Sequence, residues 1–212
     1  IFANENGKRP IVFNVKDGYP DLEVTLPCGN CEGCRLEYSR QWAIRCVHEG
    51  EMHDSNSFIT LTYNDENLPD NRSVSKREMQ LFFKRLRKNL GIKVRYFACG
   101  EYGDTYNRPH YHALIFGYDF PDKVLASKRN GNLLFKSNFL DKTWKNGYCW
   151  IGDVTFESAA YVARYIMKKQ KGKDSPEYYE IVDDETGEIY LQEKEFCLMS
   201  RNPGIGKTWL DR

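Results

Sequence analysis

The chain has 212 residues, of which 41% are hydrophobic and 29% are charged, and its formal net charge is +1. This composition is typical of a globular protein with one substantial core. No apolar run approaches the ~20 residues that span a bilayer, and the first residues do not resemble a signal peptide. Seven cysteines in a chain without an export signal favour reduced thiols or metal ligands over disulfides.

Charge is distributed unevenly along the chain. Residues 72–95 are rich in lysine and arginine and contain one acidic residue, Glu78, whereas residues 174–195 are strongly acidic and contain one basic residue, Lys194. A charge run is most often a solvated surface. The split also fits a protein with a basic side that faces nucleic acid and an acidic segment that avoids it.

The first half of the chain mixes helix and strand signals. The elements expected there are a helix over about 34–51, a strand over 58–63, a helix over 76–90 and strands over 94–99 and 109–116. Ser75 and Glu78 have the spacing of a capping box, in which each side chain accepts a hydrogen bond from the backbone amide of the other residue. Gly91 is expected to end that helix.

The second half predicts a short helix over 140–145, a strand over 148–154, a helix over about 157–169, a hairpin over 178–192 that turns at 183–187, and a last strand over 196–199. This element order predicts an α+β fold with a mainly antiparallel sheet. We expect a single domain over 1–212, with a cysteine-containing extension over about 1–56 and an acidic hairpin insertion over about 174–195.

Two histidines are candidate metal ligands. His110 and His112 lie two residues apart in a strand, so both imidazoles project from one face and can converge on one ion. Glu101, at the end of the preceding strand, can lie beside them if the two strands pair antiparallel. Such a set suits a divalent ion acting as a Lewis acid on a phosphate oxygen. The alternative is a pair of half-buried histidines with ordinary hydrogen bonds.

The helix over 157–169 carries the candidate nucleophiles. One side of it holds Tyr161, Arg164, Tyr165 and Lys168, and the opposite side holds Ala159, Val162, Ala163 and Ile166. The tyrosines are therefore expected away from the core, beside cations that favour phosphate. A phenol with a pKa near ~10 needs such cations or a metal to act as a nucleophile. The alternative is two aromatic residues on a half-exposed amphipathic helix.

Three cysteines, Cys28, Cys31 and Cys34, have the spacing of a metal knuckle, with Cys46 or His48 as the expected fourth ligand of a structural Zn²⁺. Part of an iron–sulfur pattern and three reduced thiols without metal are the alternatives. Near the C-terminus, Gly206-Lys207-Thr208 differs from a nucleotide-binding loop because Arg201 replaces the required glycine. We expect a turn there, with Gly204 and Lys207 as possible phosphate contacts.

Three ordered motifs carry a family resemblance. Residues 58–63, 108–117 and 161–169 resemble the motifs of the HUH endonucleases, and more narrowly the two-tyrosine replication initiators of microviruses. Cys28 to Arg35 and Met199 to Lys207 are similar to gokushovirus proteins in particular. The resemblance covers about residues 27–209. It implies a five-stranded antiparallel sheet with flanking helices and a ferredoxin-like core.

The resemblance also implies roles for individual residues. His110, His112 and Glu101 would bind Mg²⁺ or Mn²⁺, and Tyr161 and Tyr165 would be alternating nucleophiles, with Tyr161 in the first position. Arg164 and Lys168 would assist them at the phosphate, although the family often has lysine where Arg164 stands. The residues expected to hold single-stranded DNA are Lys84, Arg85, Arg87, Lys88 and Arg108.

The activity implied is that of a nickase and strand transferase that starts rolling-circle replication of a small phage. It would form a covalent 5′-phosphotyrosine adduct at the origin, in the cytoplasm of a bacterial host, with host replication proteins as partners and no membrane association. One alternative is a relaxase or transposase of the same superfamily. Another is a non-catalytic module that binds single strands. A zinc hydrolase would need a glutamate beside His110 or His112 in a spacing that is absent.

Overall fold

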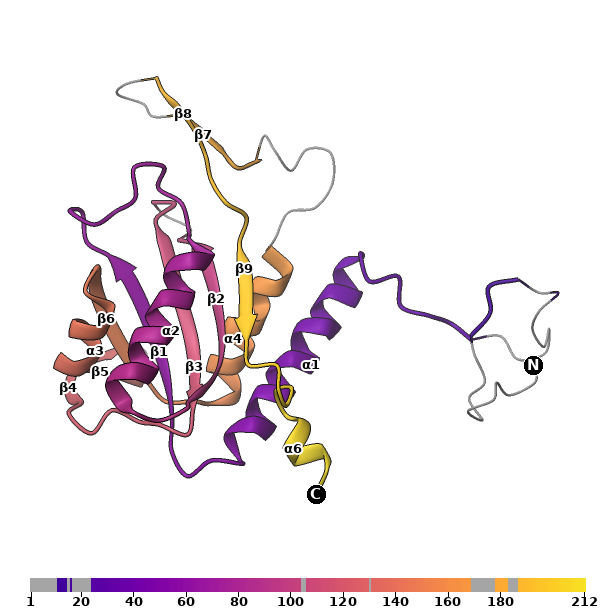
Figure 1. Ribbon diagram of the computed structural model, residues 1–212. Helices are drawn as coiled ribbons and strands as arrows, with labels where there is room; N and C mark the ends of the chain where they lie inside the picture. Colours follow the sequence, from indigo (N-terminus) through magenta and orange to yellow (C-terminus); the bar gives the residue numbers. More distant parts are fainter. Residues whose placement is uncertain are drawn as a thin grey trace. The chain divides into compact units, whose positions relative to one another are not determined.

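The computed structural model describes residues 11–14, 16, 24–103, 106–129, 131–168, 178–182 and 187–212. It divides into two units, residues 1–34 and residues 35–212. Figure 1 shows the elements of the second unit, which are considered first. The helices among the described residues are all too short or too polar to cross a membrane.

The second unit is built on a seven-stranded antiparallel sheet with the order β4-β5-β6-β1-β3-β2-β9. Its strands are β1 (Asn56–Tyr63), β2 (Arg95–Tyr102), β3 (Pro109–Phe116), β4 (Val124–Arg129), β5 (Asn132–Lys136), β6 (Gly147–Gly152) and β9 (Phe196–Met199). The prediction of an α+β fold with an antiparallel sheet is confirmed. The prediction of five strands is wrong, because β4 and β5 form an additional hairpin whose apolar residues do not alternate clearly with polar ones.

The helices are α1 (Glu32–Gly50), α2 (Lys76–Leu90), α3 (Asn138–Trp144), α4 (Phe156–Lys168) and the short α6 (Lys207–Leu210). A separate two-stranded sheet pairs β7 (Glu180–Val182) with β8 (Ile189–Leu191), which confirms the expected hairpin. Its turn, and part of the expected acidic insertion, lie outside the described residues.

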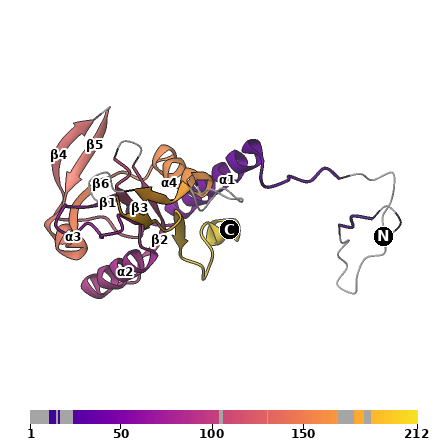
Figure 2. The same cartoon turned by 90° about the horizontal axis from the view of Figure 1, so that it is seen from above.

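The central strand β1 shows how the two faces of the sheet differ. Its odd-numbered residues, such as Ile59 and Leu61, are fully buried, whereas its even-numbered residues, such as Thr60 and Thr62, are half-buried. α2 and α3 cover the odd-numbered side, and α4 lies on the other side (Figure 2). Because successive side chains of a strand point to opposite faces, residues of both kinds alternate along β1.

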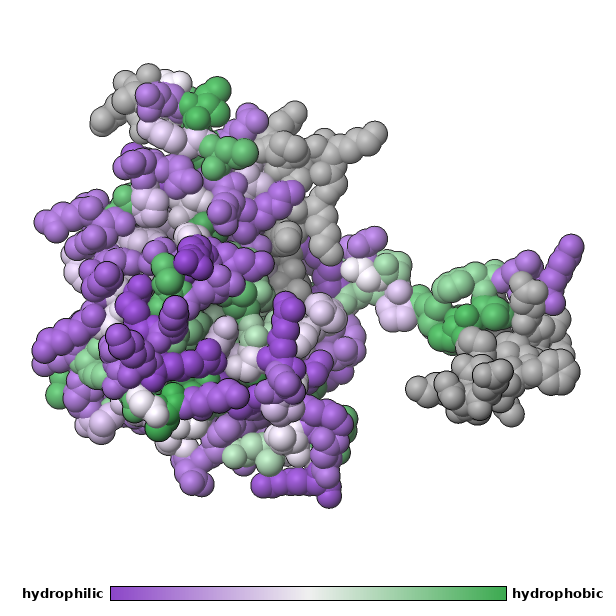
Figure 3. All heavy atoms as spheres, viewed as in Figure 1, coloured by the Kyte–Doolittle hydropathy of each residue, from purple (hydrophilic) through white to green (hydrophobic). Residues whose placement is uncertain are grey.

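The layer over the odd-numbered face is a dense aromatic core. α2 inserts Met79, Phe82, Phe83 and Leu86 into it. Ser75 caps α2 by accepting a hydrogen bond from the Glu78 amide at 3.2 Å, and Gly91 ends the helix with a positive φ of 67°. Hydrophilic side chains cover the outer surface of α2 (Figure 3).

The predicted capping box is only half formed. The Ser75 amide donates to the Tyr111 hydroxyl at 2.7 Å, so it does not need the Glu78 carboxylate. Glu78 accepts a hydrogen bond from Asn146 instead, at 3.3 Å. A tertiary contact has therefore replaced a local one.

The C-terminal segment is fastened to α1. Buried Glu49 accepts a hydrogen bond from the Gly206 amide at 2.7 Å and forms an ion pair with Arg95. The His48 ring stacks on Trp209 with 3.5 Å between centroids. The turn expected at 206–208 is in fact the first turn of α6, and the Gly206 amide is bound to Glu49 rather than free for a phosphate.

Candidate active site

The two histidines of β3 project from the even-numbered face of the sheet, as predicted. Cα pairing places Glu101 of β2 opposite His110, and Cys99 opposite His112. His112 Nε2 lies 2.9 Å from Glu101 Oε1, and both residues are buried. The antiparallel pairing that was expected to bring Glu101 to the histidines is therefore present.

Two threonines of β1 orient these imidazoles. Thr60 Oγ1 lies 3.0 Å from His112 Nδ1, and Thr62 Oγ1 lies 3.0 Å from His110 Nδ1. A hydrogen bond at Nδ1 fixes the ring and directs Nε2 away from β1, which is the role that outer residues play around metal-bound histidines. The sequence analysis missed both threonines. Their spacing of two residues in an expected strand was the available signal.

α4 brings both tyrosines to the same face of the sheet. The Tyr161 hydroxyl donates to Glu101 Oε1 at 3.4 Å, and its ring lies 5.0 Å from that of His112. The Tyr165 ring is nearly parallel to His112, with 5.8 Å between centroids. The tyrosine rings themselves lie 5.2 Å apart. Helix and sheet thus gather two phenols, one imidazole and one carboxylate at one place.

The two tyrosines differ in burial. Tyr161 is 41% exposed, as expected for a residue away from the core, but Tyr165 is only 4% exposed. The prediction that both lie off the core face is wrong for Tyr165. On a helix with 100° per residue, Tyr165 lies about 60° from Val162, at the edge of the buried stripe. α4 rests on the sheet along this edge, so the ring packs between them.

The same burial affects titration at the site. Burial lowers the pKa of His110, and the nearby His112 and Arg108 lower it further, so the neutral imidazole is favoured. Burial also raises the pKa of Tyr165 strongly, helped by Tyr161 and Glu101. A neutral imidazole can donate a lone pair to a metal, whereas a buried phenol resists ionisation until its surroundings change.

The three candidate metal ligands are not equally close. Glu101 and His112 are in contact, while the rings of His110 and His112 lie 6.4 Å apart. Among the residues that the structure describes, the group of three donors lying mutually within 4.8 Å is the cysteine cluster rather than this set. The chemistry of one carboxylate and two oriented imidazoles nevertheless fits a divalent ion.

Arg164, on the outer side of α4, is exposed. The side chain of Lys168 lies outside the described residues. Assistance by Arg164 and Lys168 at a phosphate stays a prediction.

The basic residues of α2 are not brought to this site. α2 covers the odd-numbered face, whereas the histidines and tyrosines lie on the even-numbered one. Arg85 donates to the Thr143 carbonyl, and Arg87 donates to the Val94 carbonyl. DNA binding by Lys84, Arg85, Arg87 and Lys88 therefore stays a prediction, on a surface separate from the candidate active site.

Arg108 lies nearer, at the start of β3. It forms an ion pair with Asp65 at 2.6 Å and donates to the Tyr63 carbonyl at 3.0 Å. With Asp65, Leu68, Arg72, Tyr106, Asn107 and Pro109 it lines a pocket of about 490 Å³. Arg108 is therefore two residues from His110 and already neutralised in part by an exposed carboxylate.

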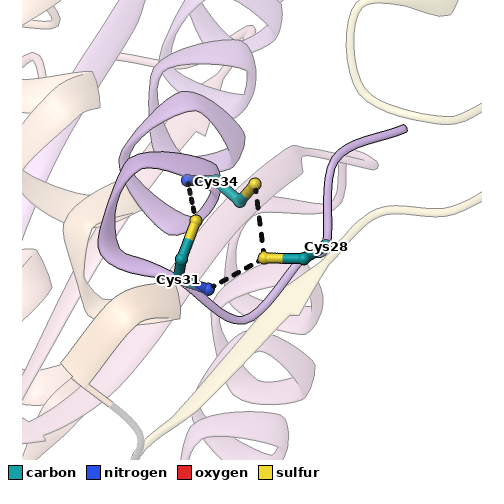
Figure 4. A group of neighbouring side chains, drawn as sticks. All are labelled: Cys28, Cys31 and Cys34. Carbon is teal, nitrogen blue, oxygen red and sulfur yellow. Dashed lines mark hydrogen bonds between the residues drawn. The ribbon is translucent and has the colours of Figure 1, made fainter. Parts of the chain in front are cut away.

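The first unit contains a second candidate metal site. The sulfur atoms of Cys28, Cys31 and Cys34 lie within 4.8 Å of one another, and they converge where the chain enters α1 (Figure 4). Cys28 Sγ and Cys34 Sγ are 3.8 Å apart. Hydrogen bonds from the Cys31 and Asn30 amides lower the pKa of the Cys28 thiol to about 7. This cluster could hold a metal ion.

Cys46 does not belong to the cluster, which corrects the predicted ligand set. It follows Cys34 by twelve residues in the same helix, a separation of about 18 Å at 1.5 Å per residue. Cys46 is fully buried in the core beside Ala43, and burial raises the pKa of its thiol. Its helical position, which serves packing, was mistaken for a ligand position.

Comparisons with known proteins cover the elements of this site. The family model for replication-associated protein ORF2 matches residues 56–170, which include all of β1, β2, β3 and α4. Replication-associated protein VP4 of Bdellovibrio phage phiMH2K is 35% identical over 100% of the chain and 66% of its own length. Replication-associated protein ORF4 of Chlamydia phage 1 is 32% identical over 72% of the chain and 41% of its own length.

Replication-associated protein ORF2 of Spiroplasma virus 4 is 35% identical over 71% of the chain and 50% of its own length. The chain thus spans between two fifths and two thirds of the length of these relatives. No solved structure matches it significantly.

Proposed function

The chain belongs to the family of replication-associated protein ORF2, and from that premise we propose that it is a metal-dependent endonuclease that nicks single-stranded DNA to start rolling-circle replication of a small phage. The observation that carries the proposal is the meeting of Tyr161 with Glu101 and His112 across the interface of α4 and the sheet. A helix that served packing alone would not need its tyrosine hydroxyl beside a buried histidine and carboxylate.

The reaction is a transesterification. The Tyr161 oxygen forms a bond to phosphorus, the bond from phosphorus to the 3′ oxygen breaks, and the proton lost by the phenol is balanced by one gained by the departing 3′-hydroxyl. Glu101 Oε1 already accepts a hydrogen bond from the Tyr161 hydroxyl. The product is a 5′-phosphotyrosine, which the 3′-hydroxyl can attack to reseal the strand.

Glu101, His110 and His112 would hold a divalent ion such as Mg²⁺ or Mn²⁺. Bound there, the ion would polarise the scissile phosphate and offset the charge that develops on it. Thr60 and Thr62 keep the Nε2 atoms of both imidazoles available by hydrogen bonding to Nδ1. The lowered pKa of His110 favours the neutral form that such binding requires.

The difference in burial favours Tyr161 for the first cleavage. Its ring is 41% exposed, whereas Tyr165 at 4% must be uncovered before it can reach a phosphate. A second tyrosine would serve a second cleavage after one round of synthesis, while the first end is still held. We place this activity in the host cytoplasm, where host replication proteins would extend the free 3′ end.

The test uses labelled single-stranded DNA from the phage origin with Mn²⁺ or Mg²⁺. The expected product is a protein–DNA adduct that survives denaturation and does not form in EDTA. Tyr161→Phe with Tyr165→Phe should abolish the adduct. An adduct in the double variant would assign the nucleophile to another residue, and strand binding without any adduct would favour a non-catalytic module.

We also propose that Cys28, Cys31 and Cys34 hold Zn²⁺. A tetrahedral ion with zinc–sulfur bonds of about 2.3 Å separates two thiolates by about 3.8 Å, and Cys28 and Cys34 have that separation. A four-iron cluster binds each thiolate to a different iron and spreads the sulfur atoms further. Residues 1–34 contain no histidine and no other cysteine, so a fourth cysteine or histidine ligand would come from elsewhere.

Metal analysis tests this site separately from the nuclease. The protein should purify with one zinc per chain, Cys34→Ser should lose it, and the control Cys197→Ser should keep it. In metal-free protein, alkylation of Cys28 by iodoacetamide should rise as pH passes through about 7, because the thiolate reacts. Zinc retained by Cys34→Ser would contradict the assignment.

A further inference from the structure

A second part of the even-numbered face carries aromatic side chains next to the candidate active site. α4 packs against β2, β3 and β9, and further along the sheet the side chains of β6 and β5 reach solvent. Tyr148 of β6 is 60% exposed, while Trp150 and Lys136 are half-buried. We call Lys136, Tyr148 and Trp150 the aromatic surface.

The strand register connects this surface to the histidines. Trp150 pairs with Thr60, which pairs with His112 on its other side, and Tyr148 pairs with Thr62, which pairs with His110. Paired residues project from the same face of a sheet, so the histidines, threonines and aromatic rings form two parallel rows. Each row spans two strand spacings, about 10 Å.

The charge of the aromatic surface favours an anion. Lys136 Nζ lies 4.1 Å from the centroid of the Trp150 ring and 6.0 Å from that of Tyr148. The described side chains on this face of β1, β5 and β6 include no carboxylate, as the even-numbered residues from Asn56 to Thr62, Asn132 to Lys136 and Tyr148 to Gly152 show. A cation beside two flat rings matches the alternation of phosphate and base in an unpaired strand.

We propose that the aromatic surface binds single-stranded DNA beside the scissile phosphate, with bases stacked on Tyr148 and Trp150 and Lys136 moved from the rings to a phosphate. The proposal rests on the proposed function, since it takes the strand that the active site cuts as the occupant. Stacking accepts any base, because every base has a flat π surface. The surface would therefore position the strand without reading its sequence, and duplex DNA, whose bases are already stacked, would gain little from it.

Fluorescence anisotropy of a labelled oligothymidylate in EDTA tests binding without cleavage. Trp150→Ala and Tyr148→Ala should each raise Kd about tenfold, as loss of one stacked base does. Lys136→Gln should weaken binding and reduce the slope of log K against log salt by about 0.7. Binding of a matched duplex should change less than binding of the single strand.

Matched controls separate binding from folding. Lys123→Gln removes a lysine that also lies over a ring, that of Phe135 at 4.8 Å, but this ring belongs to the other face of β5. It should leave the single-strand Kd within about twofold of wild type. Trp150→Phe keeps a flat ring and should retain most of the affinity. If Trp150→Ala unfolds, exposed Tyr148 still provides the test.

Binding and cleavage can fail independently. Unchanged Kd values in the Trp150, Tyr148 and Lys136 variants would overturn the aromatic surface, whatever the nuclease does. Wild-type protein that binds single strands through these residues but never forms an adduct would overturn the nuclease proposal and leave the surface standing. Tyr161→Phe, which should bind normally and form no adduct at the first cleavage site, links the two.

Discussion

The two faces of the central sheet are made by the same strands but have different chemistry. On the odd-numbered face, Leu61 and Tyr111 are fully enclosed by α2 and α3, and the Tyr111 hydroxyl forms its hydrogen bonds within the core. On the even-numbered face, Thr60 and His112 keep hydrogen bonds to one another and to Glu101 beneath a partly open layer. One face provides rigidity, and the other provides polar groups that the rigid face holds in place.

The strongest effect that this comparison predicts is the loss of Tyr161. Tyr161→Phe removes the proposed nucleophile and should slow adduct formation at the first cleavage site at least about a thousandfold. Its thermal midpoint should stay close to that of wild type, because the ring is retained and its hydroxyl is near the surface. Single-turnover adduct formation with denaturing gels measures the rate. A rate near wild type would give the first cleavage to Tyr165.

The opposite outcome is expected on the enclosed face. Leu61→Ala removes buried methyl groups and should lower the free energy of unfolding by about 2–5 kcal/mol, as measured by urea denaturation. Well below its unfolding midpoint, the variant should still form adduct at a rate within about threefold of wild type. A large rate loss in folded protein would show that the two faces are not separable.

Thr60 tests whether the open face depends on ring orientation. Thr60→Val keeps the shape of the side chain but removes its hydrogen bond to His112 Nδ1. Loss of such a partner should weaken Mn²⁺ affinity or activity about 10- to 100-fold, which titration of adduct yield against Mn²⁺ measures.

The matched control is Thr143→Val. Thr143 is buried near the other face, where its hydroxyl donates to the Phe139 carbonyl at 2.8 Å. Removing that bond should change stability and leave the Mn²⁺ titration unaltered. Equal Mn²⁺ dependence in wild type and Thr60→Val would show that Thr60 does not position the histidine.

The weakest effect is expected from a tyrosine of the enclosed face. Tyr111→Phe removes the acceptor of the Ser75 amide at the start of α2 and leaves a buried donor unpaired. Unfolding free energy should fall by about 1–3 kcal/mol, with adduct formation unchanged in folded protein. Comparison with Tyr161→Phe then contrasts two phenol hydroxyls from the two faces, one proposed to be structural and one catalytic.

Local patterns in the sequence were sufficient for most elements and for choosing the candidate residues. Alternation placed His110 and His112 on one face, and helical spacing joined Tyr161 to Tyr165, because these periodicities follow from backbone geometry alone. The α+β class followed from the order of these elements. The Ser75 cap and the terminating Gly91 are similarly local.

Packing between elements determined which layer covers which residue. The burial of Tyr165, the use of Tyr111 in place of Glu78 at the start of α2, and the placement of the α2 cations away from the histidines all depend on how elements meet. The β4–β5 hairpin and the burial of Cys46 in the core depend on it too. Periodicity states which residues share a side of an element, but the neighbour that meets that side is chosen by contacts between segments far apart in the chain.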